Sequence, residues 1–141
     1  MNQYLVIANQ TIESPQLLEA IRARIGPEPA AFHLLVPEDH LSGATWDEGL
    51  ARVEARHRLE FGIEHFAALG IEMTGEVDTT PVDGVANILV RDGQDRFDEI
   101  LISTLPVTVS RWFRMDAPSR IARLTSVPVV HIAVVMAPTS S

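Results

Sequence analysis

Apolar residues along this chain gather in five short runs, each bounded by polar residues, glycine or proline. Runs of this length are too short for helices, and their continuous apolar character is typical of buried strands. The third run alternates apolar and polar residues, which favours a partly exposed face or an edge position in a sheet. The five predicted strands are Tyr4 to Ala8, Ala31 to Val36, Ile71 to Val77, Ile100 to Ile102 and Val127 to Val135.

Between these runs, apolar residues recur at helical spacing behind residues that commonly start a helix. Ser14 offers a cap with Pro15 at the first helical position, and Gly26 with Pro27 ends this helix. Its predicted buried face carries Leu17, Leu18, Ile21 and Ile25. The other three predicted helices run from the capping pair Thr45 and Glu48 to about Leu69, from Thr80 and Pro81 to near Gly93, and from Pro118 through Leu124.

Apolar strands that alternate with helices predict a parallel sheet covered by helices on both faces. Since crossovers between parallel strands are right-handed, the chain is expected to form a doubly wound α/β fold. We therefore predict a three-layer α/β/α sandwich around a five-stranded parallel sheet in the order 3-2-1-4-5. One domain is expected over residues 1–136, followed by a loose tail over residues 137–141.

Composition narrows the possible functions. Eleven basic residues, all arginine, against nineteen acidic ones give a formal net charge of −8, which argues against nucleic acid and anionic membranes as partners. The lack of cysteine and lysine excludes thiol and Schiff-base catalysis. No signal-peptide pattern and no apolar stretch near the ~20 residues of a membrane span are present, so we expect a cytoplasmic protein.

Polar residues follow the first and fourth predicted strands, which flank the expected reversal of strand order. Ligands of open parallel sheets bind at such a reversal, beyond the carboxyl ends of the strands. An asparagine suits the edge of a base, and hydroxyls suit a ribose or phosphate. Alternatively, these residues only turn the chain and cap the segments after the two strands. The candidate ligand-binding residues are Asn9, Gln10, Thr11, Ser103 and Thr104.

The segment from Ser103 to Arg123 is basic within an acidic chain, since four arginines against Asp116 give it a net charge of +3. If its middle forms a helical turn, Arg111 and Arg114 lie on one face and can clamp a phosphate, a carboxylate or an acidic partner. The alternative is a solvated face that balances the acidic remainder of the chain.

Other chemistry has weaker support. The long helix lacks the HEXXH pattern of a metal site, which favours a solvated, salt-bridged face for Glu54, His57, Glu64 and His65. His33 and His131 lie inside apolar strands, as core histidines with satisfied hydrogen bonds do. No serine lies in a GxSxG setting, so a serine hydrolase is disfavoured.

Over nearly its whole length the chain resembles a universal stress protein domain. The resemblance rests on YLVIANQT, where that family has a strand ending in Asp-Gly-Ser; on VDTTPVDGVANIL, similar to its V-G-x-P segment; and on FDEILIST, similar to its A-D-L-I-V-M-G-S. The ending RIARLTSVPVVHIAV is similar to the last strand of the family. The resemblance implies a Rossmann-like fold of the adenine nucleotide alpha-hydrolase type.

ATP-binding members of that family carry G-x-x-G and then G-S or G-T after the fourth strand. Ser103, Pro106, Met115 and Asp116 stand at those positions here. Side chains there would strain a backbone with positive φ and block its close approach to phosphate. The resemblance therefore predicts that this chain does not bind ATP tightly through a glycine loop.

Two further segments correspond to the family's nucleotide site. Asn9 replaces the aspartate that contacts adenine in ATP-binding relatives, and Asp78 with Thr79 covers the segment that borders adenine and ribose. No cofactor is assigned, and the ligand that these positions would suit is an adenine nucleotide or another phosphate-bearing molecule.

The favoured function is a dimeric regulatory or interaction module with no enzymatic activity and an unidentified protein partner. The alternative is a sensor that binds a nucleotide or other small anion through Asn9, Ser103, Thr104 and Arg111. A dimer is expected because the apolar last strand lies at a sheet edge, which must be covered to avoid open pairing. The predicted interface residues are Val129, Val130, His131, Ile132 and Val134.

Overall fold

The computed structural model describes residues 2–38, 48–105 and 116–134 of the chain. Five parallel strands form one sheet in the order β3-β2-β1-β4-β5, which confirms the predicted topology. Because β1 lies at the centre, Leu5 pairs with His33 of β2 on one side and with Ile100 of β4 on the other. The strands are β1 Asn2–Ile7, β2 Ala30–Pro37, β3 Met73–Asp78, β4 Glu99–Thr104 and β5 Val129–Ala133.

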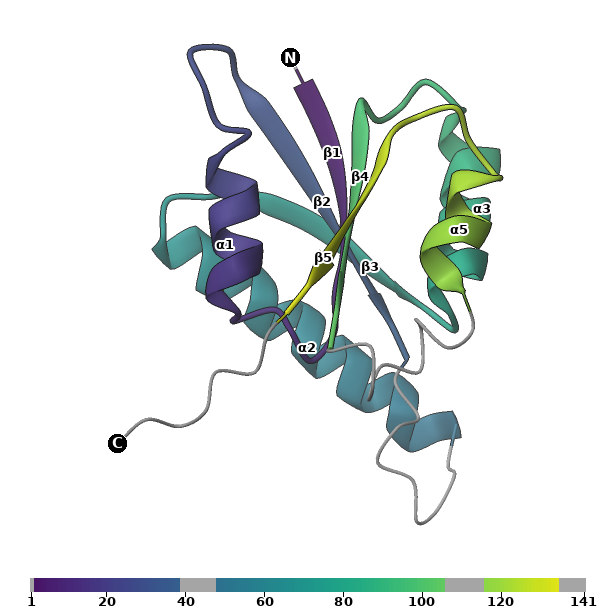
Figure 1. The fold of residues 1–141 in the computed structure, drawn as a ribbon. Helices are drawn as coiled ribbons and strands as arrows, with labels where there is room; N and C mark the ends of the chain where they lie inside the picture. The colour runs from purple at the N-terminus through teal and green to yellow at the C-terminus, as the bar shows by residue number, and fades with distance from the viewer. Residues whose placement is uncertain (1, 39–47, 106–115, 135–141) are drawn as a thin grey trace.

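Helices cover both faces of the sheet, so the three-layer prediction is also confirmed. Figure 1 shows α1 and α2 on one face and α3 and α5 on the other. The helices are α1 Pro15–Arg22, α2 Glu48–Ala68, α3 Pro81–Asp92 and α5 Ala117–Ala122. None of the helices in the described part of the chain combines the length and apolar content needed to cross a bilayer.

Alternation along each strand builds two separate cores. In β1, Tyr4 and Val6 enter the core beneath α1 and α2, whereas Leu5 and Ile7 enter the core beneath α3 and α5. Phe66 of α2 and Ile88 of α3 are among the largest fully buried side chains. The central strands are mainly apolar, as expected of strands that are covered on both faces.

The predicted helix starts are confirmed where the structure describes them. Ser14 Oγ accepts a hydrogen bond from the Leu17 N–H at 3.1 Å, and Thr80 Oγ1 accepts one from the Asp83 N–H at 3.0 Å. Thr45 lies outside the described residues. After α2, Gly70 takes the positive φ of 82° expected of a residue that stops a helix.

Several predicted boundaries differ from the structure, including those of the first helix and the last strand. The first helix ends at Arg22, and Ile25 is 46% exposed instead of buried. The reason is a tighter last turn, in which the Ile25 N–H donates to the Arg22 carbonyl, three residues back, so the side chain leaves the buried face. The last strand is also shorter than predicted, since the Val127 N–H donates to Thr125 Oγ1 before pairing begins at Val129.

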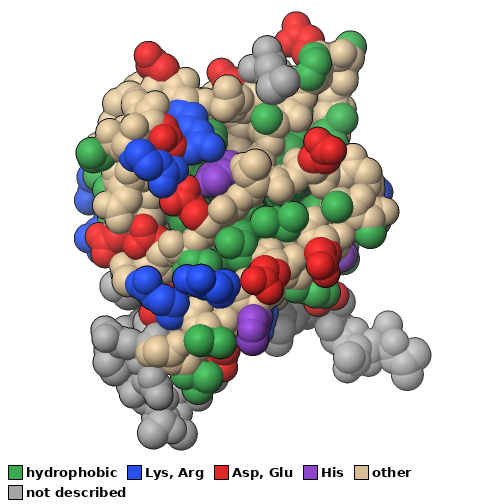
Figure 2. Space-filling model, turned by 180° about the vertical axis from the view of Figure 1, so that it is seen from behind, with side chains coloured by type: hydrophobic (Ala, Val, Ile, Leu, Met, Phe, Trp, Pro, Cys, Tyr) green, Lys and Arg blue, Asp and Glu red, His purple; other side chains and the backbone are tan. Residues whose placement is uncertain are grey.

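His33 confirms the prediction of a core histidine with satisfied hydrogen bonds. Its Nδ1 lies 2.6 Å from Thr74 Oγ1 and its Nε2 lies 2.7 Å from Glu76 Oε1, both on the edge strand β3. The carboxylate can only accept, so Nε2 carries the proton and Nδ1 accepts from the threonine hydroxyl. Figure 2 shows this side of the molecule, where histidine, arginine and acidic side chains gather.

Candidate functional site

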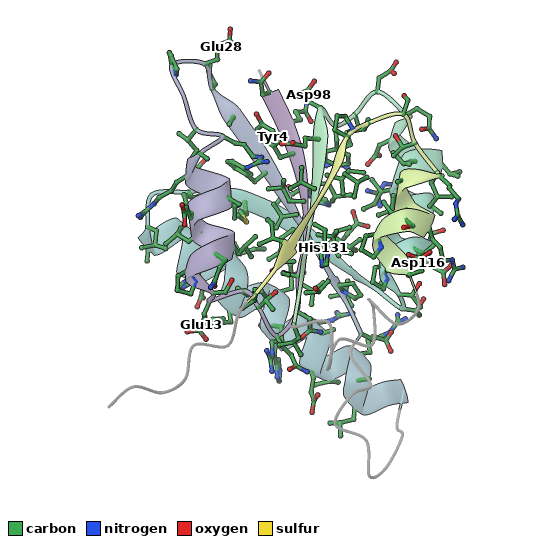
Figure 3. The ribbon with its side chains drawn as sticks, viewed as in Figure 1. Tyr4, Glu13, Glu28, Asp98, Asp116 and His131 are labelled. Atoms are coloured by element: carbon green, nitrogen blue, oxygen red, sulfur yellow. The ribbon has the colours of Figure 1, made fainter. Side chains whose placement is uncertain are left out.

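The predicted site lies at the carboxyl ends of the strands. Figure 3 labels Glu13 at this end of the molecule and Asp98 at the opposite end. Asn9 follows β1 and is only 5% exposed. Its amide Nδ2 donates to the Pro37 carbonyl at 2.7 Å, which ties the end of β1 to the end of β2. The donor that would read a base is therefore used to join two strands.

Ser103 and Thr104 point to opposite faces of the sheet, because both belong to β4 and successive side chains alternate. Ser103 Oγ donates to Thr11 Oγ1 at 2.7 Å, beneath α1 and α2. Thr104 Oγ1 lies 2.7 Å from Nε2 of His131 on β5. The structure thus brings Thr11 to Ser103, as predicted, and places Thr104 apart from that pair.

Burial closes off these hydroxyls. Ser103 is 0% exposed, Thr104 1% and Thr11 4%. Burial also lowers the pKa of His131, which keeps its ring neutral and suited to a hydrogen bond with a hydroxyl. Thr104 and His131 together provide a hydroxyl and a neighbouring base, as a nucleophile and its base do in an enzyme. The threonine is buried, however, so a substrate cannot reach its hydroxyl in this structure.

Asp78 and Thr79 form a local turn at the end of β3. Asp78 Oδ1 accepts from the Thr79 N–H at 2.6 Å, and its Oδ2 accepts from Asn87 Nδ2 at 2.9 Å. Three strand spacings separate β3 from β4, or about 14 Å. These two residues and Ser103 therefore do not form one compact site.

The remaining predicted positions give mixed results. Arg111 and Arg114 lie outside the described residues, as do Pro106 and Met115. Asp116, predicted to stand at the serine or threonine of the family's final G-S or G-T pair, has a φ of 57° and a ψ of 38°. This is the left-handed region, which aspartate tolerates better than most residues other than glycine.

A cavity of about 760 Å³ opens beside Asn9 and Gln10, between the β1–α1 loop and α2. Arg58 of α2 lines the cavity and donates from Nη1 to the Asn9 carbonyl at 3.4 Å. From the sequence, Glu54 and His57 were predicted to lie on a solvated, salt-bridged face, and this cavity was missed. A signal was available, since the apolar residues of α2 do not keep to one side of the helix. The lining residues are Asn9, Gln10, Ile12, Glu13, Ala51, Glu54, His57, Arg58 and Phe61.

Metal chemistry has no support in the described ranges, because no three histidine, aspartate or glutamate side chains within them gather closely enough to hold an ion. The buried carboxylate of Glu38, at the end of β2, pairs with Arg52 Nη2 at 3.2 Å. This ion pair ties the start of α2 to the sheet. The described side chains at the strand ends thus mainly hold the strands and α2 together.

The fold defines a doubly wound α/β protein with a five-stranded parallel sheet. No family model matches the chain, and no curated protein matches it. Solved structures do match. A universal stress protein family protein from Arabidopsis thaliana, with AMP bound, has a TM-score of 0.60 at 14% identity over 99% of this chain and 97% of its own.

Two other solved structures have a similar fold. The universal stress protein from Archaeoglobus fulgidus in complex with dAMP has a TM-score of 0.54 at 19% identity over 94% of this chain and 98% of its own. A hypothetical protein, solved as a test case for assigning biochemical function from structure, has a TM-score of 0.64 at 14% identity over 96% of this chain and 98% of its own. The chain therefore has the fold of the universal stress proteins.

Proposed function

We propose that this chain is a regulatory or interaction module that works as a dimer, without catalysis, and that it does not hold ATP through a glycine-rich loop. The observation that carries the proposal is the use of the strand-end hydroxyls inside the protein, where Ser103 bonds to Thr11 and Thr104 to His131. Buried groups that are already paired cannot replace the backbone N–H groups that surround a phosphate in a glycine cradle.

The outer edge of β5 supports the dimer. This strand pairs only with β4 among the described strands, and four of its residues are half-buried. An apolar strand in that position is a template for pairing with another chain, and a second copy would cover it. The proposed interface comprises Val129, Val130, His131, Ile132 and Val134.

A sensor of a small anion is the second candidate, and the cavity beside Asn9 and Gln10 favours it. The Archaeoglobus and Arabidopsis proteins of the same fold were solved with dAMP and AMP. An adenine nucleotide or another phosphate-bearing ligand would enter near Asn9. The guanidinium groups of Arg111 and Arg114 would supply the positive charge that pairs with its phosphate.

Calorimetric titration of the ligand-stripped protein with ATP, AMP, cyclic nucleotides and inorganic phosphate separates the two candidates. If the protein is an interaction module, none of these ligands should give binding heat at micromolar concentrations. Micromolar binding that is lost in an Arg111→Ala/Arg114→Ala double variant would instead establish the sensor. In that case, ligand at about 100 times its Kd would raise the free energy of unfolding by about 2.7 kcal/mol, which gives an independent check by thermal melting.

A further inference from the structure

The outer face of α2 carries apolar side chains that take no part in the core. Leu50 is 54% exposed, Val53 49% and Phe61 44%. Their spacing places them on one side of the helix. The exposed large apolar residues of the described chain are concentrated on α2 and the residue after it, since the full set is Ile25, Leu50, Val53, Phe61, Leu69 and Val90.

The opposite side of α2 already packs on the sheet. Ala55 and Phe66 are fully buried there, and Gly62 lies so close that an added Cβ would be 2.9 Å from Leu34 Cδ2. A surface helix normally confines its apolar residues to the side that faces the core. Packing on the sheet therefore does not account for the second apolar stripe of α2.

The cavity beside Asn9 and Gln10 lies next to this stripe. Its apolar lining comes from Ile12 and Ala51, which are buried, and from the half-exposed ring of Phe61. Neighbouring segments of chain supply the acidic lining, with Glu13 on the β1–α1 loop and Glu54 on α2. The cavity thus combines an apolar floor with carboxylates from both walls.

Two other ionisable groups line the cavity. Arg58 donates to the Asn9 carbonyl, so its charge is directed at the protein's own backbone. His57 lies one turn before Phe61, on the same side of the helix. Because the whole chain has a formal net charge of −8, the long-range field also attracts cations.

We propose that this groove, formed by the β1–α1 loop and the outer face of α2, docks a segment of a protein partner that presents a large aromatic or aliphatic side chain beside arginine or lysine. The apolar side chain enters the cavity over Ile12 and Phe61, and the basic side chain pairs with Glu13 or Glu54. Interface hot spots commonly combine an apolar anchor with charge complementarity at the rim. This inference rests on the proposed interaction function and names the chemistry of its partner.

Three labelled peptides test the proposal directly. An N-terminal fluorescein is attached to Gly-Arg-Trp-Arg-Gly, to Gly-Asp-Trp-Asp-Gly and to Gly-Arg-Ala-Arg-Gly, and binding to the full chain is followed by fluorescence anisotropy. We expect the first peptide to bind about tenfold more tightly than either of the others, because it alone has both the anchor and the charge. Amide shifts of the ¹⁵N-labelled protein should concentrate on α2 and the β1–α1 loop.

Matched variants separate the groove from the rest of the surface. Phe61→Ala should weaken binding of the first peptide about tenfold, and Glu13→Gln/Glu54→Gln about fivefold. Glu60→Gln, on the same helix but outside the cavity lining, and Val90→Ala, exposed on α3, serve as controls and should leave the affinity unchanged. Circular dichroism establishes that each variant is folded, and Phe61→Leu provides a second test of the anchor if the alanine variant unfolds.

Two results would overturn the inference: equal binding of the acidic and basic peptides, or an affinity that the groove variants do not change. Absence of binding by a protein that is a dimer would overturn the inference alone, leaving the proposed function in place. A monomeric protein would contradict the proposed function itself. Binding of a nucleotide that competes with the peptide would assign the groove to a small ligand, and would also reject the inference.

Discussion

At the scale of single residues, His33 belongs to a closed ring of contacts between side chains. His33 bonds to Glu76, which accepts two hydrogen bonds from Arg91 at 2.8 and 3.0 Å. Arg91 also bonds to Asp92, and Asp92 pairs with Arg96. The ring closes through Phe97, which lies 4.7 Å beneath the Arg96 guanidinium and stacks on His33 at 6.3 Å. The ring joins β2, the edge strand β3 and α3.

This ring predicts a pH dependence of stability. Burial lowers the pKa of His33, and Arg96 and Arg91 act in the same direction, whereas Glu76 acts against them. Since the folded pKa lies below the unfolded value of 6.5, the unfolded chain takes up the proton first as the pH falls. Below pH 6.5 the free energy of unfolding should drop, by at most about 1.4 kcal/mol per pH unit for this histidine.

Urea denaturation between pH 7.5 and pH 5.5 measures this effect. His33→Gln keeps a donor and an acceptor but cannot titrate, so it should reduce the slope of stability against pH. His57→Gln, on the exposed side of α2, is the matched control and should leave the slope unchanged. A wild-type slope that His33→Gln does not alter would contradict the role of the buried ring. The carboxylates contribute at lower pH, since hydrogen bonds from Arg91 lower the pKa of Glu76 and bring that of Asp92 to about 2.

Residue chemistry could be predicted where it is local. The caps at Ser14 and Thr80 depend on a side chain and a backbone group three residues away, and both are in the structure as the sequence predicts. The faces of the sheet to which the Ser103 and Thr104 side chains point could not be predicted in this way. It depends on whether the strand ends before or after these residues, and β4 extends through Thr104, which sends the two hydroxyls to opposite faces.

At the scale of elements, α2 lies so close to the sheet that a glycine is required at one point of contact. A Cβ added to Gly75 of β3 would lie 2.4 Å from Leu59 Cδ1 and 2.7 Å from the Leu34 carbonyl oxygen. The leucine side chain can move, but the carbonyl is held by the strand. The close packing of α2 on β3 therefore depends on the absence of a side chain at Gly75.

Gly75→Ala should consequently lower the free energy of unfolding by about 1–3 kcal/mol, the usual cost of overpacking. Gly26→Ala is the matched control, since an added Cβ there meets nothing within 4 Å, and it should change stability by less than about 0.5 kcal/mol. Chemical denaturation of both variants measures the difference. Equal stability of the two alanine variants would mean that the contact between α2 and β3 is looser than the structure has it.

The presence of each helix and strand could largely be predicted from the sequence. The residue at which an element ends, and the cavity that α2 helps to form, could not. Apolar runs and helix starts identified every strand and helix described here. The end of α1 was missed because its last turn tightens through backbone hydrogen bonds, which have no sequence signature. The cavity beside α2 was missed because it forms only when the β1–α1 loop and this helix come together in space.

At the scale of the whole molecule, the strand order follows from alternating strands and helices with right-handed crossovers, which leave few arrangements. That order places β5 at an edge, where the proposed dimer forms. The Val134 N–H donates to the Thr104 carbonyl of β4 at 2.9 Å. By the alternation of a strand, the N–H of the preceding residue, Ala133, points to the open side, where a second copy would pair.

Sedimentation velocity of the purified protein at micromolar concentration, beside Ala133→Pro and Ala133→Thr, tests the dimeric module most directly. Proline removes the outward N–H without disturbing the hydrogen bonds to β4, whereas threonine keeps that N–H. We expect a dimer for the wild type and for Ala133→Thr, and a folded monomer for Ala133→Pro. A wild-type monomer, or a dimer that Ala133→Pro leaves intact, would contradict this expectation.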